Sequence, residues 1–304
     1  MNYRQTRKSS LKQKIRFTFL LILLLGAAIY FGYAFKIKEQ IASLTPIQRN
    51  VLLIGHAGSG FFSPLNPFNP LPPSSFASIV KAIKDGADGV EIDVHLSKDG
   101  VPVLYHDETL NSMSAGKGLI EDLPASKVVG LAYTGGNPYD LFQNEKIISL
   151  ETMLQEFQQY PAYPYLHIDL RHHGPNRHAY FAGQVMGLLR RYKYPVEKVS
   201  IVYVKPDLLL AFKKEEPRIT LLLDIDQDFE KGLAIARINK LQGLVANAKG
   251  MDEAKVKKAR EQNLQVILFG PKAKSSILKA LKLEPDAIEV NNVPAMRQMI
   301  TSKY

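Results

Sequence analysis

The chain has 304 residues, of which 46% are hydrophobic and 22% are charged, so it can bury a large core and does not have the composition of a disordered protein. Its formal net charge of +10 does not indicate nucleic-acid binding, because eight of the 39 Lys and Arg residues precede residue 39, where there is no acid, and the remaining 31 nearly balance the 29 acids. The absence of cysteine excludes disulfides, lipid attachment at Cys and thiolate metal sites.

The N-terminal segment predicts a membrane anchor. Residues 17–35 are uncharged and mostly apolar, and their length is close to the ~20 residues that a transmembrane helix needs. Six basic residues lie before this run, in residues 1–16, and two follow it, so we expect the N-terminus in the cytoplasm and the remaining chain outside the cell membrane.

A cleavable signal peptide is the alternative for this segment, because Gly26, Ala27 and Ala28 are small residues of the kind found at cleavage sites. The apolar run continues past them and exceeds the usual core of about 7–15 residues, which favours an uncleaved signal anchor.

After a polar linker at residues 36–50, strand and helix patterns alternate through a predicted domain at residues 51–304. The strand-like runs are "VLLIGH", "GVEIDVHL", "VPVLYH", "PYLHIDL", "SIVYV", "ITLLLDI", "GLVAN", "LQVILF" and "DAIEV". Amphipathic helical runs between them are "SFASIVKAIKDG", "SLETMLQEFQQ", "YFAGQVMGLLRRY", "PDLLLAFKKEE", "MDEAKVKKAREQN" and "AKSSILKALKL".

This alternation over about 250 residues predicts an α/β fold, a (β/α)8 TIM barrel. Nine strands are one too many for such a barrel. We expect "VPVLYH" to be the surplus strand, because only "SKDG" separates it from the preceding strand, which suits a hairpin and is too short for a parallel crossover. The sequence shows no internal repeat and no second domain.

Residues 58–75, "GSGFFSPLNPFNPLPPSS", interrupt the alternation with five prolines and three phenylalanines. This composition predicts a long irregular loop after the first strand. Three interpretations stay open: a connection that packs on its own aromatic residues, a lid that grips substrate, or phenylalanines that dip into the membrane.

Acidic side chains occur where reactive residues of a TIM barrel lie, at the C-terminal ends of strands. Glu91 and Asp93 are two residues apart on one face of a strand, and Asp169 ends "PYLHID". Taken singly, each acid could be an ordinary strand or turn residue. If the hairpin prediction holds, however, the three acids converge, and their repulsion calls for a divalent cation, Ca²⁺ or Mg²⁺.

Two histidines also end strands beside these acids. His56 ends the first strand, and His106 ends "VPVLYH" and precedes Asp107, which could orient the ring or begin a turn. Cleavage of a phosphodiester needs one group that accepts a proton from the nucleophile and one that donates a proton to the leaving alcohol, and histidine suits both. A metal ion would neutralise charge on the phosphate.

The other histidines are less informative. His95 and His167 each lie two residues from a predicted ligand, and each could be a participant or a hydrogen-bonded wall residue. His172 and His173 are expected in a solvated loop, and contact with an anionic substrate is the alternative for them.

Residues 86–123, "GADGVEIDVHLSKDGVPVLYHDETLNSMSAGKGLIEDL", closely resemble the glycerophosphodiester phosphodiesterase family, whose pattern has a Glu-x-Asp strand, a Lys-Asp-Gly turn and a His-Asp pair. The resemblance continues through "IISLETML", "HIDLR", "VILFGPK" and "PDAIEVNNVP" and covers about 51 to 300. It implies a TIM barrel, a divalent metal and hydrolysis of a glycerophosphodiester to glycerol phosphate and an alcohol.

The resemblance also implies roles for individual residues. It makes His56 and His106 the acid/base pair, and it makes Glu91, Asp93 and Asp169 the metal ligands, with Asp169 in place of the usual glutamate. Arg171 lies where the family usually has a lysine near the phosphate, so the resemblance implies that it binds substrate.

The sequence departs from the family pattern around the phosphate. Ala57 replaces the arginine of the family's His-Arg-Gly, and residues 73–75 replace its Glu-Asn-Thr. Four later residues also differ from the pattern: Ser112, Phe269, Asn291 and Asn292. Loss of a bidentate arginine removes a strong charge-assisted contact. We therefore expect Arg171 to compensate from the other side, and we expect the glycerol end to be recognised differently.

Together these features predict a membrane-anchored, metal-dependent phosphodiester hydrolase that acts on glycerophosphodiesters or lysophospholipids. We expect a small-molecule or lipid substrate and neither a nucleic acid nor a protein partner. Two alternatives stay open: a membrane-tethered TIM-barrel binding module whose catalysis has lapsed, and a phospholipase C-like lyase that forms a cyclic phosphate. The presence of both histidines and all three acids favours an enzyme, although the fold alone does not imply one.

Overall fold

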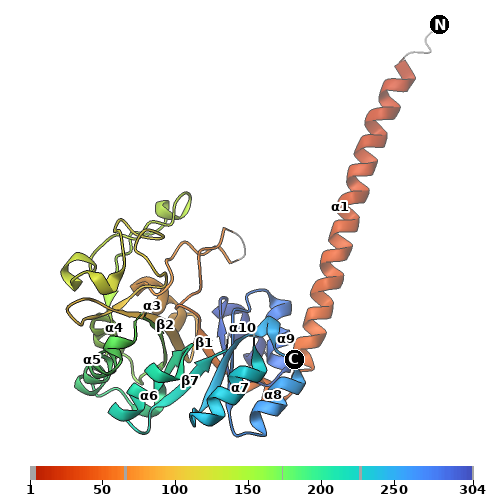
Figure 1. The fold of residues 1–304 in the computed structure, drawn as a ribbon. Coiled ribbons are helices and arrows are strands. Elements are labelled where there is room, and N and C mark those ends of the chain that lie inside the picture. Colours follow the sequence, from red (N-terminus) through yellow and green to blue (C-terminus); the bar gives the residue numbers. More distant parts are fainter. Residues whose placement is uncertain (1–4, 65–66, 173, 226–227, 303–304) are drawn as a thin grey trace. The chain divides into compact units, whose positions relative to one another are not determined.

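A computed structural model describes residues 5–64, 67–172, 174–225 and 228–302 of the chain (Figure 1). These residues form two units, an N-terminal helical segment that ends at Thr45 and the larger unit Pro46–Thr301. The larger unit holds every residue to which the sequence assigns a catalytic, metal-binding or substrate-binding role.

The N-terminal unit is dominated by helix α1 (Gln5–Ala42). Its part Leu11–Ala42 is long and apolar enough to cross a membrane, by length and composition. The helix extends beyond the predicted span of 17–35, and no proline occurs before Pro46 to interrupt it. The predicted linker 36–50 is therefore largely helical, since helix α2 (Pro46–Arg49) also lies in it.

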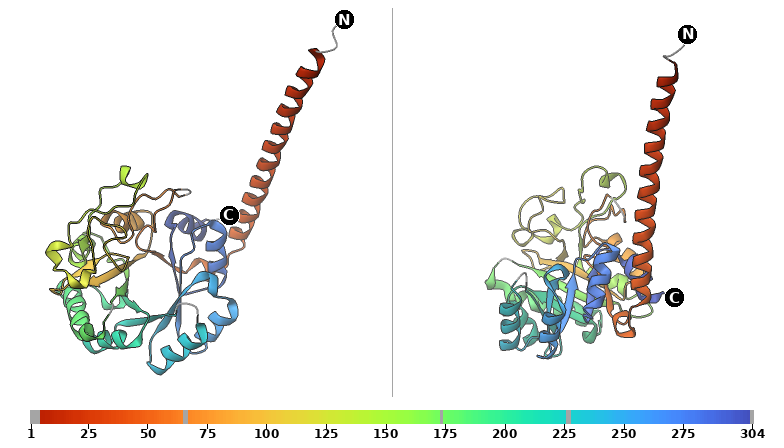
Figure 2. Two further views of the ribbon diagram at one scale, coloured as in Figure 1. Left: turned by 45° about the horizontal axis from the view of Figure 1, so that its top comes forward. Right: turned by 90° about the vertical axis from the view of Figure 1, so that its right-hand side faces the viewer.

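The larger unit contains a closed barrel of eight parallel strands, which confirms the predicted TIM fold (Figure 2). Strand β1 pairs with both β2 and β10 and so closes the ring. The eight strands are β1 (Leu52–Gly55), β2 (Gly89–Leu96), β5 (Tyr165–Arg171), β6 (Val199–Tyr203), β7 (Thr220–Asp224), β8 (Gly243–Asn247), β9 (Gln265–Phe269) and β10 (Ala287–Val290).

The surplus strand is a hairpin partner, as the sequence predicts. Strand β3 (Pro102–Leu104) pairs antiparallel with β2, and the short β4 (Ile148–Ser149) pairs antiparallel with β3. The backbone N–H of Tyr105 donates to the carbonyl of Asp93 at 3.1 Å, so the pairing continues to the residue before His106. The hairpin therefore brings His106 next to the strand that carries Glu91 and Asp93.

Helices surround the barrel, as the left view of Figure 2 shows. They are α3 (Phe76–Lys84), α4 (Leu150–Phe157), α5 (His178–Arg191), α6 (Pro206–Glu215), α7 (Phe229–Ile238), α8 (Glu253–Arg260), α9 (Lys274–Lys282) and α10 (Val293–Thr301). Side chains of Ser75, Ser149, Asp228 and Asp252 cap four of them at the N-terminus. All the helical runs expected from the sequence occur, and α7 and α10 are additional.

One part of the barrel interior is a small apolar cluster that includes Ile54, Leu222 and Ile267. A second core lies outside the barrel, under the insertion between β3 and β4, and includes Tyr105, Leu110 and Ile147. The insertion carries three short 3₁₀ turns: Ile120–Asp122, Ala125–Lys127 and Tyr139–Leu141. Others lie at Pro175–Arg177, Val196–Lys198 and Ala248–Gly250.

The proline-rich loop at 58–75 follows β1. In the described part of this loop, the regular pairing is an isolated bridge between Ser63 and Asn69. The buried side chain of Asn69 donates to the carbonyls of Ser59, Gly60 and Phe61 at 3.2 Å each. The loop is therefore irregular, as its composition predicts, but its first turn is held by a polar side chain and not only by aromatic packing.

Candidate active site

Three carboxylates converge at the mouth of the barrel. Strands β2 and β5 are neighbours, and their register places Asp93 directly beside Asp169. One oxygen from each of Glu91, Asp93 and Asp169 lies within 4.8 Å of the others. Glu91 and Asp93 are only 3% and 1% exposed. The predicted convergence of the three acids is therefore present in the structure.

The negative charges of these three carboxylates repel one another. Burial, together with the charges of Asp93, Glu289 and Asp169, raises the pKa of Glu91 well above its usual value. Burial also raises the pKa of Asp169, and Asp93 adds to this, although Arg171 acts in the opposite direction. Burial opposes ionisation of Asp93 too, but Arg171, His106 and Ser74 outweigh it and lower its pKa. A divalent cation would relieve this conflict, and an all-oxygen ligand set fits Ca²⁺ or Mg²⁺.

Hydrogen bonds orient two of these acids. The backbone N–H of Ala57 donates to Glu91 Oε2 at 2.6 Å. The hydroxyl of Ser74 donates to Asp93 Oδ2 at 2.8 Å, and it accepts from the backbone N–H of Asp93 at 3.1 Å. Ala57 and Ser74 are fully buried and have φ of 46° and 56°. The positions that depart from the family pattern thus hold the carboxylates in place.

Arg171 lies over the same acids. Its Nε and Nη2 donate to Asp93 Oδ1 at 2.9 and 2.5 Å, and its Nη2 is 2.8 Å from Asp169 Oδ2. Burial would lower its pKa, but the neighbouring carboxylates raise it further above its usual value. Its side chain remains 34% exposed, so the guanidinium can also meet a ligand from solvent.

His56 lies at the C-terminal end of β1, as predicted. Its Nδ1 donates to Asn291 Oδ1 at 2.7 Å, because an amide oxygen only accepts, and this leaves Nε2 as the proton acceptor. The ring centroid lies 5.0 Å from that of Phe61 and 5.7 Å from that of Phe269. Burial lowers the pKa of His56 despite the charge of Glu289 and the hydrogen bond with Asn291, and so favours the neutral ring.

The pKa of His106 is shifted in the opposite direction to that of His56. Its Nδ1 donates to Asp107 Oδ1 at 2.6 Å, so Asp107 orients the ring. Burial would lower the pKa of His106, but the hydrogen bond to Asp107 and the charge of Asp93 together raise it. One histidine is therefore set to accept a proton and the other to hold one.

Phe61 lies between the two histidines. Its ring centroid is 4.8 Å from that of His106, and both histidine contacts are edge-to-face. The cavity between the strands at this point is small, about 40 Å³, and His56, Glu91 and Asp169 line it. Phe61 therefore forms an apolar wall between the two groups that would transfer protons.

Sequence reasoning missed two acids at this cavity. Glu289 on β10 is 3% exposed, and Asp224 ends β7. Glu289 accepts from Nδ1 of His167 at 2.7 Å, which makes His167 a hydrogen-bonded wall residue. The available signal was an acid inside or at the end of an otherwise apolar strand, in "AIEV" and "TLLLD".

The expectation of a solvated loop was wrong for His172. It is only 8% exposed, and its ring packs against Phe181 at 5.7 Å and His178 at 5.4 Å. Its Nδ1 also lies 3.1 Å from Glu121. Apolar packing against α5 therefore overrides the polar composition of this segment, while His173 lies outside the described residues. His95 is also buried, with its ring 6.3 Å from that of Tyr105.

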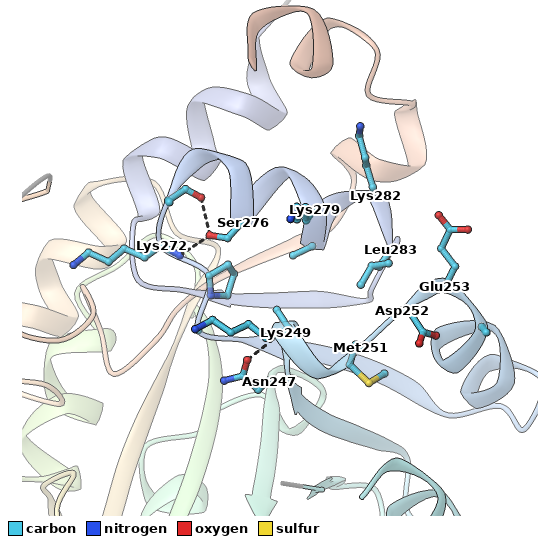
Figure 3. Close-up of a pocket in the computed structure, with 16 residues that line it drawn as sticks. Asn247, Lys249, Met251, Asp252, Glu253, Lys272, Ser276, Lys279, Lys282 and Leu283 are labelled. Carbon is cyan, nitrogen blue, oxygen red and sulfur yellow. Dashed lines mark hydrogen bonds between the residues drawn. The ribbon is translucent and has the colours of Figure 1, made fainter. Parts of the chain in front are cut away.

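A larger cavity, about 1150 Å³, lies beyond the ends of β8 and β9 (Figure 3). Its lining includes Lys249, Lys272, Lys279 and Lys282, and Figure 3 shows Lys249 and Lys272 extending to the same side. None of the predicted site residues lines it. Size therefore does not mark the candidate active site, which is identified by its converging acids and histidines.

Comparison with known proteins agrees with the fold. The model of the glycerophosphoryl diester phosphodiesterase family matches residues 69–295. Glycerophosphodiester phosphodiesterase 1 of Mus musculus is 32% identical over 120 residues, which is 39% of this chain and 34% of that protein. The Homo sapiens protein of the same name is 29% identical over 158 residues, 46% of this chain and 45% of that protein. The chain thus spans less than half the length of these curated relatives.

Solved structures share the fold over most of the chain. An Oleispira antarctica phosphodiesterase in complex with the product sn-glycerol-3-phosphate has a TM-score of 0.71 and 23% identity, covering 82% of this chain and 96% of that one. A putative glycerophosphodiester phosphodiesterase from Galdieria sulphuraria has a TM-score of 0.70 and 18% identity, covering 83% and 98%. Because the family model matches about three quarters of its length, the chain belongs to the glycerophosphoryl diester phosphodiesterase family.

Proposed function

We propose that the protein is a metal-dependent phosphodiester hydrolase that cleaves glycerophosphodiesters or lysophospholipids. The observation that carries this proposal is the meeting of three carboxylates and two histidines of opposite pKa shift at one barrel mouth. Membership of the family supports it.

Glu91, Asp93 and Asp169 would hold the cation, Ca²⁺ or Mg²⁺. When bound, such an ion neutralises charge that develops on the phosphate oxygens. The contacts from Ala57 N–H and the Ser74 hydroxyl would keep the ligand oxygens in place, as hydrogen bonds to metal ligands generally do.

The two histidines divide the proton transfers. His56 Nε2 accepts a proton from water as the water oxygen attacks phosphorus, while the hydrogen bond to Asn291 holds the ring in the required tautomer. His106, protonated beside Asp107, donates its proton to the alcohol oxygen as the bond between phosphorus and that oxygen breaks. The products are a phosphate monoester and an alcohol.

Arg171 is the proposed substrate-binding residue. It is the cationic side chain at the acid cluster, and it stands in for the arginine that Ala57 replaces. Phe61 and Phe269 flank His56 with apolar surface instead. Apolar walls favour an acylated glycerol over a bare diol, which makes lysophospholipids candidate substrates beside glycerophosphodiesters.

The N-terminal helix is proposed as an uncleaved signal anchor that spans the cell membrane once, with the catalytic unit outside. The excess of basic residues before the apolar run supports this orientation. Protease treatment of intact cells tests this orientation, because an external barrel is degraded whereas a cytoplasmic barrel is protected.

A hydrolysis assay on the full chain in detergent tests the proposal. The substrates are glycerophosphocholine, glycerophosphoethanolamine, glycerophosphoglycerol and lysophosphatidylcholine, each with Ca²⁺, Mg²⁺ or a chelator. We expect metal-dependent release of a phosphate monoester, detected by ³¹P NMR. A cyclic phosphate product would instead indicate the lyase. A folded chain that binds metal and turns over none of the four would contradict the proposed hydrolase activity on these substrates and favour a binding module.

A further inference from the structure

Phe68 of the proline-rich loop packs on Tyr139 and Phe142 of the insertion between β3 and β4. These three side chains and Leu141, which lies between Tyr139 and Phe142 in the sequence, are called here the aromatic tip. The Phe68 ring lies 5.3 Å from that of Phe142, edge to face, and 6.5 Å from that of Tyr139. Leu141 is 75% exposed, Phe142 60% and Phe68 45%. Large exposed apolar side chains that pack on one another form a patch, which scattered single residues do not.

The loop that carries Phe68 is depleted of charge. Residues 57–80, which include the loop that carries Phe68, contain no Asp, Glu, Lys or Arg. Asp140 lies within the tip, but its oxygens accept from the backbone N–H groups of Gly135 and Gly136 at 2.7 and 2.9 Å. Glu145 accepts from the N–H of Ala77 at 2.9 Å. The acids nearest in sequence are thus engaged by backbone donors.

The aromatic tip is connected to the candidate active site through the same loop. The ring of Phe62 stacks on Tyr139 with centroids 4.8 Å apart, and its neighbour Phe61 lies between His56 and His106. Figure 1 shows both contributing segments among the loops drawn in orange to yellow-green. The tip therefore belongs to the side of the barrel on which substrate would enter.

We propose that the aromatic tip inserts into the surface of a lipid bilayer, the membrane to which the N-terminal helix is proposed to anchor the chain. Exposed aromatic rings beside leucine suit the boundary between headgroups and acyl chains. The same chain carries a helix, Leu11–Ala42, that is long and apolar enough to cross a membrane, so a bilayer is the partner that the chain itself supplies for an apolar tip.

This proposal deepens the proposed function and rests on the proposed anchor. A tip docked in lipid would present the barrel mouth to molecules that partition into the bilayer. The substrate class that this arrangement favours is an amphiphilic phosphodiester, such as a lysophospholipid, over a freely diffusing glycerophosphodiester.

The chain contains no tryptophan, so one substitution installs a unique fluorescent probe. We would place Leu141→Trp in the full chain and reconstitute it in phosphatidylcholine vesicles with and without lipids brominated on the acyl chains. Ile238→Trp is the matched control, because Ile238 is 74% exposed but ends α7, next to the start of β8 and so at the opposite end of the barrel.

The expected result is a blue-shifted emission of L141W that loses intensity in brominated vesicles, with no loss for I238W. Equal emission of the two variants in both kinds of vesicle would overturn the proposal. Protection of L141W from aqueous acrylamide without quenching by bromine would also overturn it, because that result would indicate a second protein copy on the tip. Phe142→Trp repeats the measurement if L141W does not fold.

The readout is independent of turnover. A chain without hydrolase activity but with quenched L141W would contradict the proposed function alone. Release of the chain from vesicles by alkaline carbonate would contradict the anchor and with it this proposal.

Discussion

The two histidines of the candidate site are made different by single neighbouring residues. His56 is paired with the neutral amide of Asn291 and is buried between two phenylalanines, whereas His106 is paired with the carboxylate of Asp107. The neutral partner of His56, together with Glu289, compensates only part of the desolvation cost of the charged ring, whereas the anionic partner of His106, together with Asp93, outweighs that cost. This difference supports the proposed roles of His56 as the base and His106 as the acid.

Asp107→Asn tests the acid role through pH. The substitution removes the hydrogen-bonded charge that raises the pKa of His106, so this pKa falls and the ring loses its proton at a lower pH. We expect the basic limb of the profile of kcat/KM against pH to move to lower pH, with little change in KM. Glu108→Gln, which removes a neighbouring charge instead, is the control. An unmoved basic limb would contradict the role of His106 as the acid.

Ser74→Gly tests whether the hydroxyl of Ser74 holds the predicted metal ligand Asp93 in place. Glycine tolerates the positive φ at this position, so the substitution removes the hydroxyl without adding backbone strain. Loss of a hydrogen bond to a metal ligand typically weakens affinity by about 10–100-fold. Calorimetric titration with Ca²⁺ of protein that a chelator has freed of metal measures this affinity. Ser276→Gly on α9 is the control. An unchanged affinity would show that Asp93 does not depend on Ser74.

At the residue scale the sequence predicted the groups that end strands and offered Asp107 as the partner of His106, but it missed Asn291, the partner of His56. Position at the C-terminal end of an apolar run was enough to select His56, Glu91, Asp93 and Asp169. The contact of His56 with Asn291 joins residues 235 positions apart, and only the closed barrel reveals it. The roles assigned to these residues stay predictions.

At the scale of elements, alternating periodicity was sufficient to predict the barrel and its hairpin. It missed α7, whose sequence carries Gly232, and α10, whose second residue is Pro294. Proline is tolerated in the first turn of a helix, and Gly232 is required because a Cβ there would lie 2.3 Å from a side-chain atom of Ile225. Tertiary packing therefore explains Gly232 in α7, and position in the first turn explains Pro294 in α10.

Replacement of two glycines by alanine is predicted to change the free energy of unfolding in opposite directions. A Cβ at Gly89 in β2 would lie 2.2 Å from the carbonyl oxygen of Tyr165, whereas a Cβ at Gly187 in α5 would meet nothing within 4 Å. We expect Gly89→Ala to lower the free energy of unfolding by about 1–3 kcal/mol or more through overpacking. Gly187→Ala should raise it by about 0.5–1 kcal/mol, because alanine favours helix. Thermal unfolding of both variants measures the difference, and equal melting temperatures would contradict the packing described for β2.

At the scale of the whole molecule, the acidic barrel mouth links stability to metal binding. Burial raises the pKa values of Glu91 and Asp169, so ionising them in the folded protein without a cation costs stability. A ligand at 100 times its Kd stabilises the folded state by about 2.7 kcal/mol. We expect Ca²⁺ or Mg²⁺ to raise the melting temperature of the wild type and of His56→Ala, but not of Glu91→Ala. A shift that survives in Glu91→Ala would place the cation elsewhere.

The central claim is that this barrel mouth performs metal-dependent cleavage with His56 as the base. The most direct measurement is kcat/KM on the best phosphodiester substrate for the wild type, His56→Ala and the control His178→Ala, together with calcium affinity. We predict that His56→Ala loses about 10²–10⁴-fold in kcat/KM with its metal affinity retained, and that His178→Ala keeps its activity. Full activity of His56→Ala, or turnover that continues in chelator, would contradict the account.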